Sequence, residues 1–236
     1  MVVFWDLRAA EMILPMLAFI CIVYVLFFLL LKKGKLNNVM IPVQFCVSFL
    51  IIGELIEIVT NSHNPAELPL YFSTLVFLVN GIVCFSKKNS SLYSVSYFLS
   101  LILGFYITLV LLITPYTIIF TMHENFSDYR HCFVYLSHLI DVFVFLWLAT
   151  IKKIKFTKYD LVCSVVIAFL YSTLIVILSI VLLGANGDGY DFATHINVWW
   201  WYVFYPAVIC ALSYVGGYIV QKIPSYYIPF NKKWKF

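Results

Sequence analysis

A small set of polar side chains within otherwise apolar stretches could do chemistry in this chain: Glu54, Glu57, Ser73, Thr74, His138 and Asp141. A hydroxyl is a weak nucleophile, and it becomes reactive when an adjacent base such as imidazole takes its proton and a carboxylate orients that base. Ser73 or Thr74 could be the nucleophile, with His138 as the base. Asp141 or Glu54 could orient the imidazole, and the set would then suit nucleophilic acyl transfer.

The same residue types also suit other roles. Serine and threonine in membrane spans commonly hydrogen-bond to their own helix backbone, and a His–Asp pair three residues apart can satisfy itself inside a helix bundle. Metal binding is a further use, for which the possible ligands are Glu54, Glu57, His138 and Asp141. The chain contains no HExxH or CxxC spacing, so we predict neither a metal nor a cofactor.

The composition identifies the surroundings of these residues. Of the 236 residues, 64% are hydrophobic and 11% are charged, whereas soluble domains have about 25% charged residues. The length accommodates roughly seven spans of about 20 residues each. It leaves no room for a large extramembrane catalytic domain or for a Rossmann, P-loop or nucleic-acid-binding module. We therefore predict an all-α, multi-pass protein of the cell membrane, with one domain over residues 1–236.

Seven apolar runs are separated by lysine clusters, prolines or connectors rich in Gly, Asn and Asp. The predicted spans are residues 13–31, 39–60, 68–86, 93–115, 132–151, 160–183 and 198–220. The first run is long enough to span and is followed by KKGK, so we expect it to be a retained helix. If all seven span with the N-terminus outside, 13 of the 15 basic residues fall inside, and only Arg8 and Arg130 remain outside. This asymmetry predicts an N-out, C-in orientation.

That orientation places several polar residues at one depth. His138 and Glu54 each lie six residues below the outer end of their spans, or about 9 Å along the helix axis. Ser73 and Thr74 lie five to six residues below Leu68, and Asp141 follows three residues after His138. Because ionisable groups in a membrane usually face the bundle interior or a wet cavity, we predict a polar pocket open to the outer side. The predicted binding residues of this pocket are Glu54, Glu57, Arg130 and Asn186.

Several motifs follow one another between about residues 50 and 220: LPLYFSTL, YSVSYFLSLILGFYITLVLLITP, FVYLSHLIDVFVFL, LLGAN and WWWY. Their order resembles that of the YwaF-like family of bacterial integral membrane proteins. The wider group is similar to eukaryotic transmembrane lipid acyltransferases and to androgen-induced hydrolases of fatty-acid esters, which are described as using a Cys or Thr nucleophile with a membrane-embedded His. The resemblance implies Ser73 as the nucleophile, where the family carries Cys, and His138 as the base. Thr74 stands where the family has Asp.

Three classes of function remain open from the sequence. The first is a pocket for membrane lipids or acyl chains, with acyl transfer or ester hydrolysis as its chemistry. The second is a lipid- or solute-binding or transport subunit without chemistry, although no duplicated half with paired broken helices is evident. The third is a structural partner in which an exposed small-residue face at Gly216 and Gly217 packs against other helices. The predicted partners are lipids or acyl chains, not nucleic acid.

Overall fold

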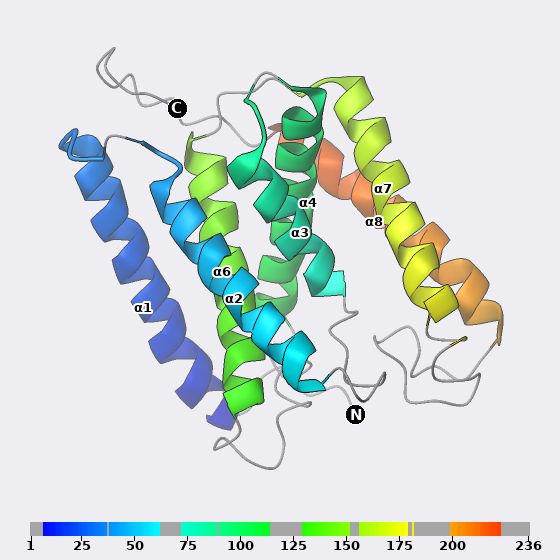
Figure 1. The fold of residues 1–236 in the computed structure, drawn as a ribbon, viewed down its shortest axis with the longest axis horizontal. Helices are drawn as coiled ribbons and strands as arrows, with labels where there is room; N and C mark the ends of the chain where they lie inside the picture. The colour runs from blue at the N-terminus through cyan, green and yellow to red at the C-terminus, as the bar shows by residue number, and fades with distance from the viewer. Residues whose placement is uncertain are drawn as a thin grey trace. The chain divides into compact units, whose positions relative to one another are not determined.

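The computed structural model describes residues 7–36, 38–61, 72–88, 90–113, 129–151, 156–178, 181 and 199–222. These residues form seven helices (Figure 1). The helices are α1 (Leu7–Lys32), α2 (Ile41–Asn61), α3 (Phe72–Phe85), α4 (Ser91–Ile113), α6 (Tyr129–Ile151), α7 (Lys158–Leu178) and α8 (Trp199–Lys222). The all-α prediction is confirmed for the described residues, and each helix overlaps one predicted span.

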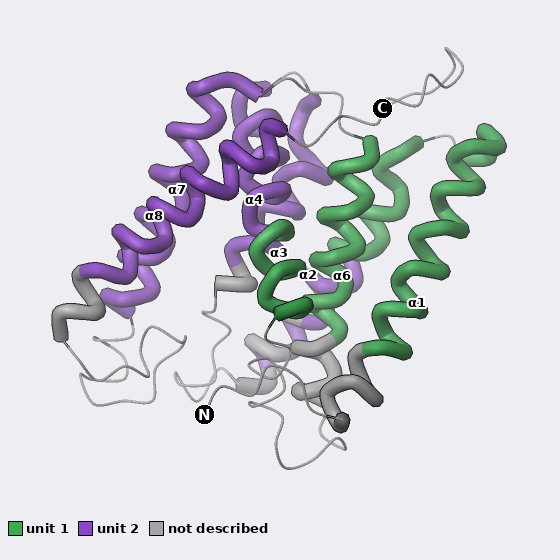
Figure 2. Tube along the Cα trace, turned by 180° about the vertical axis from the view of Figure 1, so that it is seen from behind, with its two compact units in different colours: residues 1–47, 104–153, 224–236 green, residues 48–103, 154–223 purple. Residues whose placement is uncertain are grey.

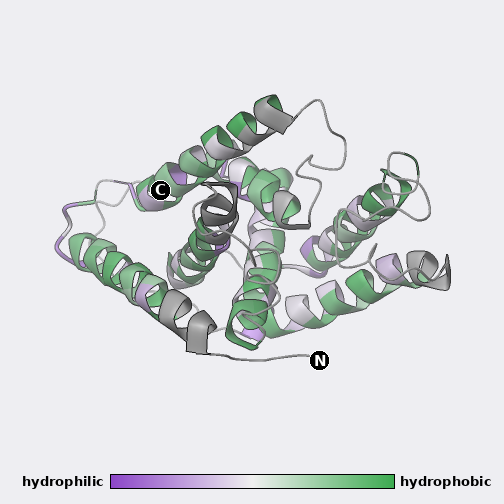
Figure 3. Ribbon diagram, turned by 90° about the horizontal axis from the view of Figure 1, so that it is seen from below, coloured by the Kyte–Doolittle hydropathy of each residue, from purple (hydrophilic) through white to green (hydrophobic). Residues whose placement is uncertain are grey.

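The helices are apolar over most of their length (Figure 3). In the described part of the chain, four helices contain a stretch long and apolar enough to cross a membrane. These stretches are Leu14–Lys32, Ser91–Ile113, Lys158–Leu178 and Phe204–Lys222. The other three helices contain shorter apolar stretches, which are Ile41–Gly53, Leu75–Phe85 and Leu136–Ile151. Such helices are typical of a membrane protein.

The chain divides into two compact units, which Figure 2 colours separately. Unit 1 comprises Met1–Val47, Gly104–Lys153 and Pro224–Phe236. Unit 2 comprises Ser48–Leu103 and Ile154–Ile223. The division falls inside α2 and α4, and the prediction of a single domain stays a prediction.

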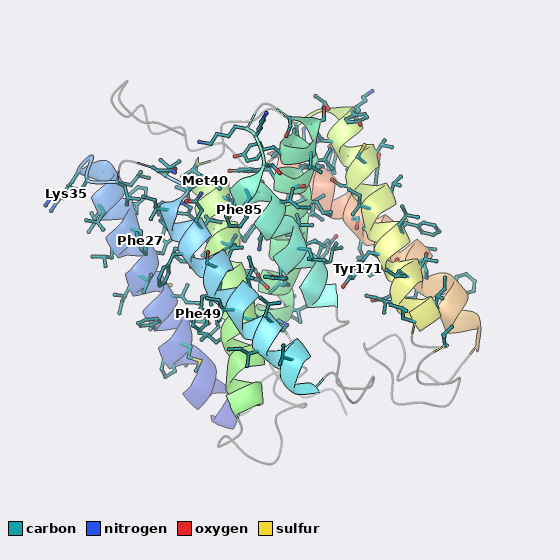
Figure 4. The ribbon with its side chains drawn as sticks, in the orientation of Figure 1. Phe27, Lys35, Met40, Phe49, Phe85 and Tyr171 are labelled. Atoms are coloured by element: carbon teal, nitrogen blue, oxygen red, sulfur yellow. The ribbon has the colours of Figure 1, made fainter. Side chains whose placement is uncertain are left out.

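Aromatic rings join α1 to α6 in unit 1. Trp147 is fully buried and stacks on Phe143, with ring centroids 6.1 Å apart. Tyr24 meets the Trp147 ring edge-on at 5.9 Å, and Phe27, labelled in Figure 4, does so at 6.1 Å. The Trp147 indole N–H donates a hydrogen bond of 2.8 Å to the carbonyl oxygen of Val39. This bond satisfies the polar end of an otherwise apolar side chain.

Small residues line the buried face of α7 in unit 2. Four of its buried residues recur every four positions: Asp160, Ser164, Ala168 and Ser172. Helix α8 packs along α7, and a Cβ atom at Gly217 would overlap with Leu161 Cδ1. Gly216 and Gly217 are both buried. The expectation that these glycines form an exposed face for other proteins is therefore wrong.

The N-terminal ends of α7 and α4 are closed by side-chain caps. The Thr157 backbone N–H and hydroxyl each donate to Asp160 Oδ2 at 2.7 Å, and the Asp160 N–H donates to Thr157 Oγ1 at 3.3 Å. This reciprocal pattern is a capping box. At α4, Ser90 Oγ accepts a hydrogen bond of 3.1 Å from the Tyr93 N–H. Each cap satisfies backbone donors that the first helical turn would otherwise leave unpaired.

Candidate functional site

Helix α6 carries the part of the candidate site that the structure describes best. It begins at Tyr129, three residues before the predicted span. His138 therefore lies nine residues into the helix, which is about 13 Å along its axis. Its depth of six residues below the outer end of the membrane span stays a prediction. Asp141 follows almost one turn later, so the two side chains lie on neighbouring parts of one helix face.

The two side chains differ in exposure. His138 is half-buried, whereas Asp141 is only 3% exposed. The His138 Nδ1 atom lies 3.5 Å from the hydroxyl oxygen of Ser137, at the long limit of a hydrogen bond. The next residues on α6, Val142 and Phe143, are buried. The carboxyl group is thus buried while the imidazole is partly accessible, as in a triad whose buried acid orients its base.

A cysteine that the sequence analysis did not select lies near Asp141. Cys46 of α2 belongs to the same unit and is within electrostatic range of the Asp141 carboxyl group. Its thiol is free and half-buried. No spacing rule connects two residues so far apart in the chain, so only the packing of α2 against α6 could reveal this neighbour.

The predicted nucleophiles are on α3. Ser73 and Thr74 are the second and third residues of Phe72–Phe85, and their side chains lie outside the described part of the structure. Their predicted depth, counted from Leu68, depends on residues that also lie outside it. Ser73 belongs to unit 2 and His138 to unit 1, so the predicted Ser73–His138 contact stays a prediction.

Three of the four predicted binding residues lie on helices α2 and α6. Glu54 and Glu57 lie on α2 one turn apart, and Arg130 is the second residue of α6. The side chains of these three residues are outside the described part of the structure, as is all of Asn186. Their convergence on one pocket is thus untested.

A second polar cluster joins α3 to α4 in unit 2. The Ser100 hydroxyl donates a hydrogen bond to Asn80 Oδ1, and both residues are almost completely buried. Ser96 lies one turn before Ser100 and is also buried. This satisfied cluster favours a structural role, because a buried amide bonded across helices stabilises their association. The sequence analysis did not select this cluster, although two serines four residues apart, Ser96 and Ser100, share one helix face and could have indicated it.

Within the described ranges, no group of three or more His, Cys, Asp or Glu residues could hold a metal ion. Comparison with known proteins found no matching family model, curated protein or solved structure. The case for a function therefore rests on the residues of this chain.

Proposed function

We propose that this protein is a multi-pass membrane protein that binds an acyl chain of a membrane lipid beside His138 and Asp141 and transfers or hydrolyses its ester. The observation that carries the proposal is the half-buried imidazole of His138 three residues before the almost fully buried carboxyl group of Asp141. Ionisable groups inside a membrane are costly and usually functional. A carboxylate one turn from an imidazole can orient it as a general base.

The proposed reaction begins when the Ser73 hydroxyl attacks the ester carbonyl and His138 takes the hydroxyl proton. The tetrahedral intermediate collapses to an acyl-serine, and the leaving alcohol receives the proton from His138. Water or the hydroxyl of a second lipid then attacks the acyl-serine carbonyl and loses its proton to His138. The bond between the acyl group and Ser73 Oγ breaks, and His138 returns the proton to the Ser73 oxygen. The choice of Ser73 over Thr74 is supported by the motif order shared with the YwaF-like group.

The proposal includes seven spans with the N-terminus outside. It is supported by lysines at the corresponding helix ends, such as Lys32 at the end of α1, Lys88 after α3 and Lys222 at the end of α8. In a chain without its native cysteines, single cysteines introduced near Asn61, residue 128 and residue 188 should react with an impermeant thiol reagent from outside. Cysteines near Lys88 and residue 155 should not, and labelling of both sets from the same side would contradict the topology.

The chemistry is tested with the purified full-length chain in lipid nanodiscs. A long-chain fluorophosphonate should label Ser73, and the chain should hydrolyse a fluorogenic long-chain ester. His138→Ala should lower turnover by about 10²- to 10⁴-fold, because the general base is lost. Ser137→Ala is the matched comparison: it removes only the 3.5 Å contact to His138 Nδ1 and keeps the imidazole, so it should lower turnover far less than His138→Ala.

Three results would change the assignment. Labelling of Thr74, with Thr74→Val inactive and Ser73→Ala active, would move the nucleophile by one residue. Equal turnover by His138→Ala and the unmodified chain would remove the proposed base. Co-purification of an acyl lipid with no turnover in any variant would leave a lipid-binding protein without chemistry.

A further inference from the structure

The ends of several helices of unit 2 meet near Gly217 of α8. A Cβ atom at this glycine would overlap with Leu161 Cδ1 of α7 and would lie 3.2 Å from Phe98 Cζ of α4. Helix α7 begins three residues before Leu161, at Lys158, and α8 ends five residues after Gly217, at Lys222. Both lysines therefore lie at the same end of unit 2 (Figure 1).

Helix α4 brings two more lysines to this end. The ring of Phe156, which precedes α7, packs on Phe98 with centroids 4.5 Å apart. Helix α4 begins seven residues before Phe98, and Lys87 and Lys88 come four and three residues before that start. Both lysine side chains are exposed. Partial desolvation lowers the pKa of Lys88, so a neighbouring anion would stabilise its ammonium form.

The acid in the first turn of α7 does not offset these charges at the surface. Asp160 is 4% exposed, and its carboxylate accepts two hydrogen bonds from Thr157 within the capping box. We call Lys87, Lys88, Lys158 and Lys222 the lysine end of unit 2. Its exposed charge is positive.

Exposed apolar side chains lead along α7 and α8 up to the lysine end. Tyr159 and Val162 of α7 are exposed, as are Val215 and Tyr218 of α8. The ammonium group of Lys222 lies 5.4 Å from the centre of the Tyr218 ring. Tyrosine next to lysine at a helix end is typical of the membrane–water boundary. An apolar surface that ends in ammonium groups is complementary to an amphipathic anion.

We propose that the lysine end binds the headgroup of an anionic phospholipid whose acyl chains lie along the exposed apolar faces of α7 and α8. The phosphodiester pairs with Lys158 and Lys222, and Lys87 and Lys88 add to the attraction. Basic clusters at this level of a membrane protein attract anionic lipids by about 1 kcal/mol per residue. The site uses no residue of the proposed acyl-transfer reaction, so either can be absent without the other.

The test uses the full-length chain in mixed micelles with equal amounts of phosphatidylglycerol and phosphatidylcholine, and native mass spectrometry to count the lipids retained. The unmodified chain should retain phosphatidylglycerol in preference. Each lysine removed should weaken that retention about 5-fold, so Lys158→Gln with Lys222→Gln should weaken it about 25-fold. The charge-matched control is Lys32→Gln with Lys33→Gln at the end of α1, which should retain the preference.

Several outcomes would overturn the proposal. One is equal retention of the two lipids by the unmodified chain. Another is an equal loss of phosphatidylglycerol retention in the two double variants, since that would be a general effect of charge. Displacement of phosphatidylglycerol by soluble glycerol phosphate would show that the acyl chains contribute nothing. If the double variant does not fold, the unmodified chain still decides, because its preference must decline as salt is raised; a salt-independent preference is incompatible with the proposal.

Discussion

Unit 1 and unit 2 join their helices with different kinds of side chain. In unit 1, α1 and α6 meet through the large rings of Tyr24, Phe27, Phe143 and Trp147. In unit 2, α8 approaches α7 at a glycine, and the buried face of α7 consists largely of serine and alanine. Membrane helices associate mainly through packing and interhelical hydrogen bonds, because lipid is as apolar as the side chains. The first contact should therefore be sensitive to truncation, and the second to enlargement.

The two contacts also differ in how their polar atoms are satisfied. In unit 1, the Thr150 hydroxyl donates a hydrogen bond of 2.8 Å to the Leu146 carbonyl oxygen. Because the Thr150 proton is used in this bond, the Tyr24 hydroxyl is the donor in its hydrogen bond to Thr150 Oγ1. In unit 2, the hydroxyl oxygens of Ser164 and Thr173 on α7 are buried without a hydrogen-bond partner among the described residues. Polar groups thus stabilise the ring-based contact, whereas the Ser164 and Thr173 hydroxyls carry a desolvation cost.

Trp147→Ala should give the largest effect. It removes a fully buried ring from the α1–α6 contact and leaves the Val39 carbonyl without its donor, which should cost about 4 kcal/mol. The measurement is the free energy of unfolding of the purified chain in a denaturing-detergent titration. Phe45→Ala on α2 is the control, because its ring is 72% exposed and its loss should cost less than about 0.5 kcal/mol. Similar losses in the two variants would show that ring packing does not hold unit 1 together.

Three glycine-to-alanine variants test the close approaches. At Gly104 of α4, the new Cβ would lie 2.6 Å from the Cβ of Phe145, an atom fixed to the α6 backbone. At Gly217, the nearest atom is the tip of Leu161, which can rotate away. We expect Gly104→Ala to cost about 2 kcal/mol and Gly217→Ala less than about 1 kcal/mol.

Gly81 of α3 is the reference for this series, because nothing lies within 4 Å of its added Cβ. Gly81→Ala should stabilise the chain by up to about 1 kcal/mol through helix propensity alone. The same detergent titration ranks all three variants. A loss at Gly217 as large as that at Gly104 would mean that Leu161 cannot move, and the α7–α8 contact would then be as rigid as the contact at Gly104.

The helices were predictable from the sequence because the apolar runs end at lysines, prolines and polar connectors. Residues 93–115 were predicted, and the helix Ser91–Ile113 begins two residues earlier, while residues 114–115 lie outside the described part of the chain. The predicted span 132–151 omits the first turn of α6, because Tyr129, Arg130 and His131 are helical but not strongly apolar. Hydropathy finds the apolar part of a helix and misses a polar helical end.

The candidate site was predictable only where it is local. His138 and Asp141 are three residues apart on one helix, so their placement on the same helix face follows from helix geometry. The nearness of Cys46 to Asp141 depends on how two distant segments pack, and periodicity does not determine that. The partner of Gly217 was predicted wrongly for the same reason. A glycine suits close packing against any helix, and the sequence does not show whether that helix is α7 or belongs to another protein. The Ser73–His138 contact is also non-local, and it stays a prediction.

Ser164→Ala should give the smallest change and the opposite sign. The Ser164 hydroxyl is fully buried and makes no hydrogen bond within the described part of the chain. Alanine keeps the small size that the buried face of α7 needs and removes the unsatisfied group, so the free energy of unfolding should rise by up to about 1 kcal/mol. Ser100→Ala is the matched control, because its hydroxyl donates to the buried Asn80 amide and its loss should cost about 1 kcal/mol. If Ser164→Ala destabilises the chain as Ser100→Ala does, the Ser164 hydroxyl has a partner, and the polar atoms of α7 contribute to stability as those of unit 1 do.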